Sequence, residues 1–242
     1  MLVTHGCDGM SGNPGTEATS FELLRATAIH EARLNVLLVT LGHCRGLTAS
    51  IADMAVLKSF AEVRRAQRLA PRPAGVHRAL FGGLLPGPSA DPAPPDAWLP
   101  AELRQLGYQT AGVGWDACFS SAELVDGFER FLRLEFEARG QLAAAIEDID
   151  LDRPFFAFAN LMDTRYRPTR DLSLFDQVAA AERVDVALGA LISTLPERTL
   201  VVVCSDFGLC FGEGNCWGRY VEHPVSRDVF VARFRLDGEP LP

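Results

Sequence analysis

The chain has 242 residues, of which 48% are hydrophobic and 22% are charged. This composition is typical of a folded globular protein and excludes a disordered one. A formal net charge of −8 argues against a broad nucleic-acid surface, although a local basic pocket can lie within an acidic exterior. No apolar run approaches the roughly 20 residues that cross a bilayer, and the first residues lack the basic start and apolar core of a secretion signal. We therefore expect a cytoplasmic protein that binds neither nucleic acid nor membrane.

The first half of the chain predicts one buried strand among helices. Residues 1–34 are expected to form a loosely docked arm followed by a helix from Ser20, and residues 35–242 a single domain. The apolar run Asn35–Leu41 has the length and valine content of a buried parallel strand. A helix is expected from about Ile51 to Leu69, and a short packed helix over 78–85.

The second half alternates between helices and strands. Helices are expected over 100–107, 134–148 and 173–194, and strands over 108–113, 154–160, 199–204 and 228–234. This alternation predicts an α/β fold with a mostly parallel sheet and helices on both faces. In such sheets ligands bind beyond the carboxyl ends of the strands. Three such ends are visible in the sequence, at 42–45, 160–165 and 205–208.

Five stretches of the chain carry a family resemblance through their order and spacing. They are 35–45, 75–86, 103–113 with 127–131, 154–168, and 199–224. Together they resemble the alkaline phosphatase/sulfatase superfamily, and within it the small bacterial sulfatase-like enzymes. The resemblance implies that fold, together with hydrolysis of a phosphate or sulfate ester by one or two divalent cations and a Ser, Thr or modified Cys nucleophile.

The sequence departs from this family at most positions that the chemistry needs. Asp206 keeps the acid of the family's Asp-His-Gly motif. The other positions have lost their functional side chains: Gly42 and Leu47 replace acids, Pro73 or Ala74 stands at the nucleophile, and Phe207, Arg219 and Arg165 replace histidines. One carboxylate cannot hold a catalytic cation unaided, so we expect no metal ion and no other cofactor.

Polar side chains nevertheless remain at the expected crevice. The candidate catalytic residues are Asp206, His223 and His77, and the candidate ligand-binding residues are His43, Arg45, Asn160, Asp163, Arg165 and Arg219. An arginine presents a rigid fork that suits phosphate or carboxylate. We therefore predict an anion pocket that needs no metal. The alternative interpretation is that the three arginines are solvated or paired with Asp163, Asp206 and Glu213.

Three functions stay open. The first is a metal-independent anion-binding or accessory protein in a biosynthetic pathway, with a small anionic ligand or a partner protein. The second is an enzyme with a rebuilt metal-free acid–base or cysteine-dependent site. Cys44, beside His43, is one candidate thiol, but adjacent residues of an extended chain point to opposite sides and Cys44 also suits a packing role. The third is a divergent metal-dependent phosphoester or sulfoester hydrolase whose ligands lie at other positions.

Overall fold

A computed structural model describes most of the chain. The described residues are 3–4, 34–42, 44, 54–68, 70, 72–83, 98–115, 118–134, 138–164, 174–218 and 223–241. The helix predicted from Ser20 and four candidate site residues (His43, Arg45, Arg165 and Arg219) lie outside them. No helix in the described ranges combines the length and the apolar character that crossing a membrane requires.

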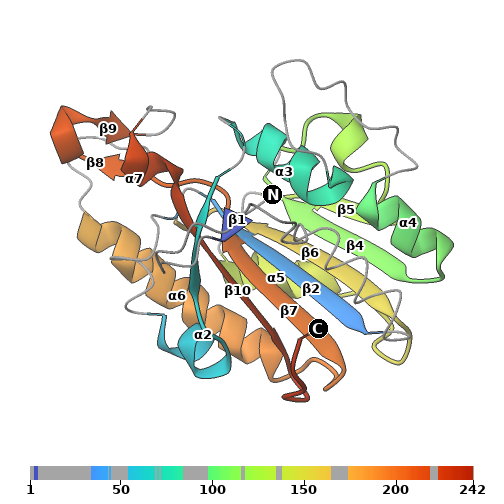
Figure 1. The fold of residues 1–242 in the computed structure, drawn as a ribbon. Helices are drawn as coiled ribbons and strands as arrows, with labels where there is room; N and C mark the ends of the chain where they lie inside the picture. The colour runs from blue at the N-terminus through green and yellow to red at the C-terminus, as the bar shows by residue number, and fades with distance from the viewer. Residues whose placement is uncertain are drawn as a thin grey trace, which may run out of the picture.

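An eight-stranded sheet forms the centre of the described fold (Figure 1). Its strand order is β1 (Val3–Thr4), β3 (Arg64–Gln67), β10 (Asp228–Arg235), β7 (Thr199–Ser205), β2 (Asn35–Leu41), β6 (Phe155–Leu161), β4 (Gln109–Gly114) and β5 (Arg130–Arg133). The five strands from β7 to β5 are parallel, whereas β10, β3 and β1 pair antiparallel. The predicted α/β fold with a mostly parallel sheet is confirmed.

Helices cover both faces of this sheet. One face packs beneath α3 (Pro73–Gly82), α4 (Leu99–Gln105) and the short η2 (Ala122–Leu124), and Phe156 and Phe158 lie in the apolar cluster there. The other face packs against α2 (Ala55–Phe60), α5 (Ala138–Ile146) and α6 (Leu174–Ile192). Every residue of β2, β6 and β7 is buried, as a central strand covered on both faces requires.

Small elements extend beyond the carboxyl end of β7. The hairpin strands β8 (Cys210–Phe211) and β9 (Trp217–Gly218) flank η3 (Glu213–Asn215), and α7 (Pro224–Arg227) runs directly into β10. Figure 1 shows this group at one end of the molecule, past the sheet. It includes part of the family-like block at 199–224.

The helix predicted over 51–69 is wrong in its second half. Helix α2 covers only Ala55–Phe60, and Arg64–Gln67 forms strand β3. Strand β3 lies between β10 and β1, and Ala66 is its only buried residue. Its hydrogen-bonding partners are distant in the sequence, so local periodicity does not reveal it.

The predicted short helix at 78–85 begins earlier than expected. Helix α3 starts at Pro73 and ends before Gly83, which has a left-handed backbone (φ 65°). Proline suits the first helical turn and glycine suits the left-handed position after the last turn, so both bounds follow from local chemistry.

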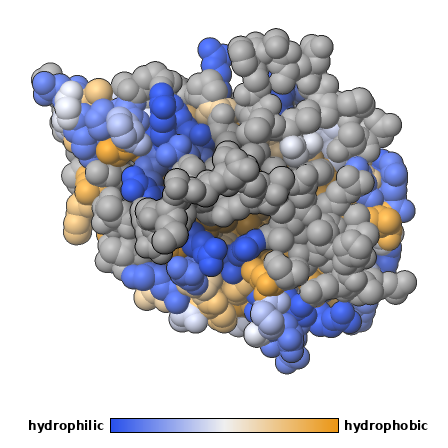
Figure 2. All heavy atoms as spheres, viewed as in Figure 1, coloured by the Kyte–Doolittle hydropathy of each residue, from blue (hydrophilic) through white to orange (hydrophobic). Residues whose placement is uncertain are grey.

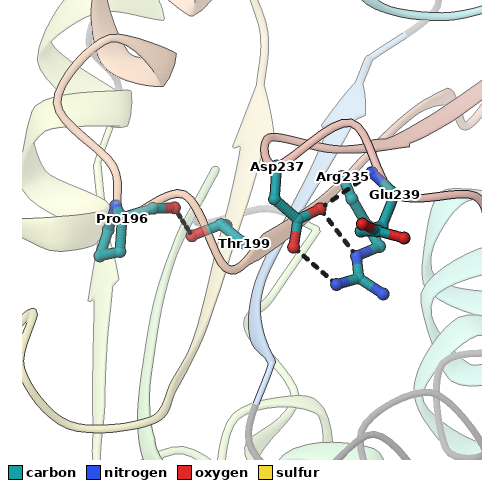
Figure 3. Close-up of polar contacts among 5 residues, drawn as sticks. All are labelled: Pro196, Thr199, Arg235, Asp237 and Glu239. Atoms are coloured by element: carbon teal, nitrogen blue, oxygen red, sulfur yellow. Dashed lines mark hydrogen bonds and ion pairs between the residues drawn. The ribbon is translucent and has the colours of Figure 1, made fainter.

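Polar contacts close the edge of the sheet opposite to the carboxyl ends (Figure 3). Arg235 donates to Asp237 through Nε (3.0 Å) and Nη2 (2.6 Å), and the Thr199 hydroxyl donates to the Pro196 carbonyl at 2.6 Å. The hydrogen bond from Arg235 lowers the pKa of Asp237. These contacts fix the turn that follows β10 and the start of β7. The candidate site lies at the opposite edge of the sheet.

Candidate functional site at the carboxyl ends of the strands

The ends of β2, β6 and β7 are joined by hydrogen bonds. The Gly42 amide donates to the Leu161 carbonyl (2.7 Å), and the Thr164 hydroxyl donates to the Gly42 carbonyl (2.8 Å). On the other side the Asp206 amide donates to the Leu41 carbonyl (3.1 Å). The three strand ends that the sequence singled out therefore meet at one edge, where parallel strands present their ligand sites.

A row of buried polar side chains lies just below this edge. Thr40, Asn160 and Cys204 stand side by side in register on β2, β6 and β7. Asn160 donates from Nδ2 to Thr40 Oγ1 at 2.9 Å, and Thr40 Oγ1 lies 3.4 Å from Nε2 of His77 on α3. Two predicted residues, His77 and Asn160, are thus brought together through Thr40, which the sequence did not single out.

His77 is a buried ring surrounded by aromatic side chains. It is 0% exposed, and its centroid lies 4.6 Å from that of Phe119 and 5.8 Å from that of Phe158. Such a setting holds the ring in one orientation and keeps water away from it. His77 therefore ties α3 to the end of β2, and it is poorly placed to exchange protons with a ligand in solution.

Cys204 and Asp206 lie on β7 and just beyond it, and both are buried. Burial first, and the negative charge of Asp206 second, raise the pKa of Cys204 to about 12. The thiol is therefore protonated at neutral pH and is not an activated nucleophile. Cys44 is also 0% exposed, and it lies in an apolar cluster with Leu41 and Met54.

The guanidinium group of Arg68 lies over the aromatic ring of Phe207. Phe207 is 0% exposed, and the guanidinium carbon of Arg68 lies 4.9 Å from its ring centroid. A cation over an aromatic face is attracted by the quadrupole of the ring. Arg68 follows β3, where the sequence predicts a helix, so the contact between this arginine and Phe207 could not be predicted from the sequence.

Gly42 lies against Met162 at the ends of β2 and β6. A β-carbon added at Gly42 would be 2.6 Å from Met162 Sδ and 3.2 Å from the Leu161 carbonyl oxygen. A longer side chain at this position therefore requires Met162 to move. The space that the family resemblance assigns to a carboxylate ligand is filled here by a thioether.

Gly208 lets the loop after β7 approach α7 closely. A β-carbon at Gly208 would lie 2.4 Å from the Val225 carbonyl oxygen, and the Gly208 amide donates to the Ser226 carbonyl at 3.2 Å. The N-terminus of α7 is capped by His223, whose Nδ1 accepts from the Val225 amide at 3.3 Å. This bond requires Nδ1 to be unprotonated, so His223 has a structural task, and its Nε2 faces Gly214.

The remaining predicted acid lies on the turn after β6. Asp163 is half-buried there, between Met162 and Thr164. Within the described ranges, no group of three or more His, Cys, Asp or Glu side chains is arranged to hold a metal ion. The described strand ends thus combine separate carboxylates with an aromatic ring, a thioether and a guanidinium.

The fold of the chain is that of the alkaline phosphatase/sulfatase superfamily. The lipoteichoic acid synthase LtaP from Listeria monocytogenes superposes with a TM-score of 0.62 and 12% identity, over 83% of this chain and 65% of LtaP. A protein in the alkaline phosphatase superfamily from Vibrio parahaemolyticus gives 0.58 and 15%, over 86% of this chain and 61% of its own length. A 2-O GAG sulfatase gives 0.59 and 12%, over 86% and 66%.

The chain thus spans less than two thirds of the length of the first two of these proteins. No family model matches the sequence, and a search of curated proteins found no significant match. Identities at this level establish the fold, and the chemistry has to be argued from the residues of this chain.

Proposed function

We propose that this chain is a sulfatase-fold protein that binds an oxyanion without a metal ion and does not carry out metal-assisted ester hydrolysis. The contact between Arg68 and Phe207 carries the proposal. The family resemblance assigns a metal-binding histidine to position 207, and the phenyl ring there has no lone pair to offer a cation. A guanidinium covers that ring, so a fixed positive charge lies in this part of the fold.

The donor set at the described strand ends does not fit a divalent cation. Such a cation needs several oxygen or imidazole ligands around one point. Here Gly42 offers no side chain, Met162 Sδ fills the adjoining space, and Asp206 has Phe207 as its neighbour. The described strand ends therefore provide no ligand set for metal-assisted hydrolysis.

Arginines are the groups that would bind the anion. From the family resemblance we expect Arg45, Arg165 and Arg219 on loops that face the same crevice. A guanidinium fork donates two parallel hydrogen bonds to a phosphate, sulfate or carboxylate group, and these bonds are stronger than those between neutral groups. Such a ligand would be anionic, like the esters that the family resemblance implies as substrates, and arginines would bind it in place of metal cations.

Cys44 and Cys204 favour a binding function over a cysteine-dependent enzyme. A nucleophilic thiol needs a lowered pKa and access to its substrate. The pKa of Cys204 is instead raised to about 12, and Cys44 is fully buried among apolar side chains.

Paired arginine variants test the proposal. Phenyl phosphate and phenyl sulfate would be titrated calorimetrically into the wild type, into the double variant Arg165→Ala/Arg219→Ala, and into Arg104→Ala, which removes an exposed arginine on α4. The double variant should bind at least about tenfold more weakly, because each lost charge-assisted bond is worth about 1.5–3 kcal/mol. Equal affinity in all three proteins would refute the crevice as the anion site.

A further inference from the structure

A cavity of about 330 Å³ opens on the flank of the sheet, away from the ends of β2 and β6. It is lined by Arg65, Gln67, Pro224, Arg227 and Asp228, which come from β3, α7 and the start of β10. Its volume reaches the lower end of the range for small-molecule sites. Hydrophilic residues gather over α7, β8 and β9 on the face of the molecule in Figure 2.

The sheet register brings the polar side chains of this cavity together. Gln67 lies directly opposite Asp228, and Arg65 is opposite Phe230. Arg65 and Gln67 are two residues apart on β3, so both side chains leave the sheet on the face opposite to buried Ala66. Arg65 is diagonal to Asp228 and donates to its Oδ1 from Nε at 2.6 Å.

The charges in the cavity favour an anion. Among the described residues, two guanidinium groups and one carboxylate line it. The Asp228 side chain is only 13% exposed, whereas the Arg65 side chain paired with it is 64% exposed. The carboxylate is therefore covered, and a ligand that enters meets the exposed guanidinium groups of Arg65 and Arg227 before it meets the carboxylate.

Hydrogen bonds hold the walls of the cavity in place. The Arg68 amide at the end of β3 donates to the Arg227 carbonyl at 2.9 Å. On its other side, α7 accepts from the Gly208 amide through Ser226, whose hydroxyl donates to the His223 carbonyl at 2.9 Å. A site with a fixed backbone loses little entropy when a ligand binds.

We propose that this flank cavity binds a compact molecule that carries a phosphate or sulfate group, with Arg227 and Arg65 as its ligands. The ligands assigned to this cavity differ from the residues assigned to the strand-end crevice. Its volume exceeds what a bare ion fills, so the ligand class is a small monoester. Gln67 and the ring of Pro224 provide a polar and an apolar contact for the organic part.

The test uses the full chain and titrates it with phenyl phosphate, phenyl sulfate and inorganic phosphate. Arg227→Ala should weaken monoester binding by about tenfold, because it removes a charge-assisted contact. Arg64→Ala is the matched control, since Arg64 is a neighbouring exposed arginine of β3 that pairs with Glu62 and does not line the cavity. It should bind like the wild type.

A second variant changes the affinity in the opposite direction. Asp228→Asn keeps an oxygen acceptor for Arg65 and removes the negative charge of Asp228, so monoester binding should tighten by a few-fold. Arg227→Ala, Asp228→Asn and the Arg64→Ala control are each made in the Arg165→Ala/Arg219→Ala background, so that the strand-end crevice does not contribute to the titration and the flank cavity is measured alone. Equal affinities for Arg227→Ala and Arg64→Ala, or weaker binding by Asp228→Asn, would overturn the proposal. Tighter binding of inorganic phosphate than of either monoester would overturn the assigned ligand class.

Discussion

Thr40 is the hydroxyl on which the buried polar row depends. It accepts from Asn160 and lies within reach of His77, and the other residues of its strand are apolar except for Asn35 at the start. Asn160 Oδ1 has no hydrogen-bond partner within the described residues, so the amide is held mainly through its Nδ2 bond to Thr40. A buried amide that loses such a bond bears the cost of its desolvation.

Thr40→Val should lower the free energy of unfolding by about 1–3 kcal/mol, because it leaves the buried Asn160 donor without its acceptor. Urea denaturation measures the change. The double variant Thr40→Val/Asn160→Leu should recover part of this loss, since it removes both polar partners together. If the double variant loses as much as the sum of the two single variants, the hydrogen bond does not couple these residues.

The raised pKa of Cys204 predicts that the stability of the fold depends on pH. Its pKa of about 12 in the folded chain lies above the ordinary value of 9.0. Between these values the unfolded chain releases the thiol proton and the folded chain retains it, so rising pH favours unfolding. Below pH 9.0 both states are protonated, and the effect vanishes there.

The free energy of unfolding of the wild type should therefore fall faster above pH 9 than that of Cys204→Ala, by up to about 1.4 kcal/mol per pH unit. Urea titrations at pH 8, 9 and 10 measure the two slopes. Val202→Ala, on the same face of β7, provides a control that loses packing without losing a titratable group. Parallel slopes for the wild type and Cys204→Ala would contradict the raised pKa.

At the scale of elements, a carboxylate on α6 holds α2. Asp185 is 3% exposed and accepts from the amides of Val56 (2.8 Å) and Leu57 (2.9 Å), the second and third residues of α2. These amides have no partner within a helix, so a carboxylate from outside satisfies them and complements the helix dipole. Helix α2 has six residues, too few to be stable without such help.

Asp185→Ala should lower the free energy of unfolding by about 2–4 kcal/mol, because two buried amides lose a charged acceptor. Chemical denaturation checks the value, and hydrogen exchange should show faster exchange at Val56 and Leu57. Glu182→Ala changes an exposed acid on the same helix and should have little effect. Equal losses in the two variants would show that Asp185 is not the capping group.

The close approach of Gly208 to α7 leads to a second prediction about the packing of elements. Gly208→Ala should lower the free energy of unfolding by about 2–4 kcal/mol, because its β-carbon would overlap the Val225 carbonyl oxygen and push α7 away. Gly107→Ala is the control. It has a positive φ of 86° but no atom within 4 Å of the added carbon, so only about 1 kcal/mol of backbone strain is expected. A smaller loss at Gly208 than at Gly107 would contradict the close approach.

The elements that the sequence predicts well are those whose chemistry is local. Asn35–Leu41 was predicted with the bounds that it has, and the strand predicted at 199–204 is Thr199–Ser205. Both are mostly apolar runs, rich in valine and leucine, that are buried on both faces of the sheet. Strand β3 was missed because arginines and a glutamine surround its single buried alanine, and its stability comes from pairing with β10 and β1.

The residues of the candidate site also divide into those that the local sequence predicts and those that depend on distant contacts. The strand ends could be located from the order of strands and glycines, so Asn160 and Asp206 were correctly placed at the carboxyl edge. Arg68 and Thr40 could not be found, because one follows an unpredicted strand and the other contacts His77 only once α3 packs on the sheet. His223 was a candidate for catalysis, and the structure gives it a capping role that depends on the bend before α7.

At the scale of the whole molecule, the chain has a net charge of −8, and packing holds individual arginines at defined positions of the fold. Arg68 over Phe207 and the Arg65–Arg227 cavity both lie on the β7–β10–β3 side of the carboxyl edge. Positive groups that are fixed by packing attract anions despite an acidic exterior, because the local field dominates at contact distance. Weak binding at high ionic strength is the expected consequence.

Metal dependence tests the central claim most directly. The purified chain would be analysed for Zn, Mn, Ca and Mg by inductively coupled plasma mass spectrometry, and phenyl phosphate would be titrated with and without EDTA. Metal-independent binding predicts far less than one ion per chain and the same affinity in both titrations. A stoichiometric metal ion, together with binding or ester hydrolysis that EDTA abolishes, would contradict it.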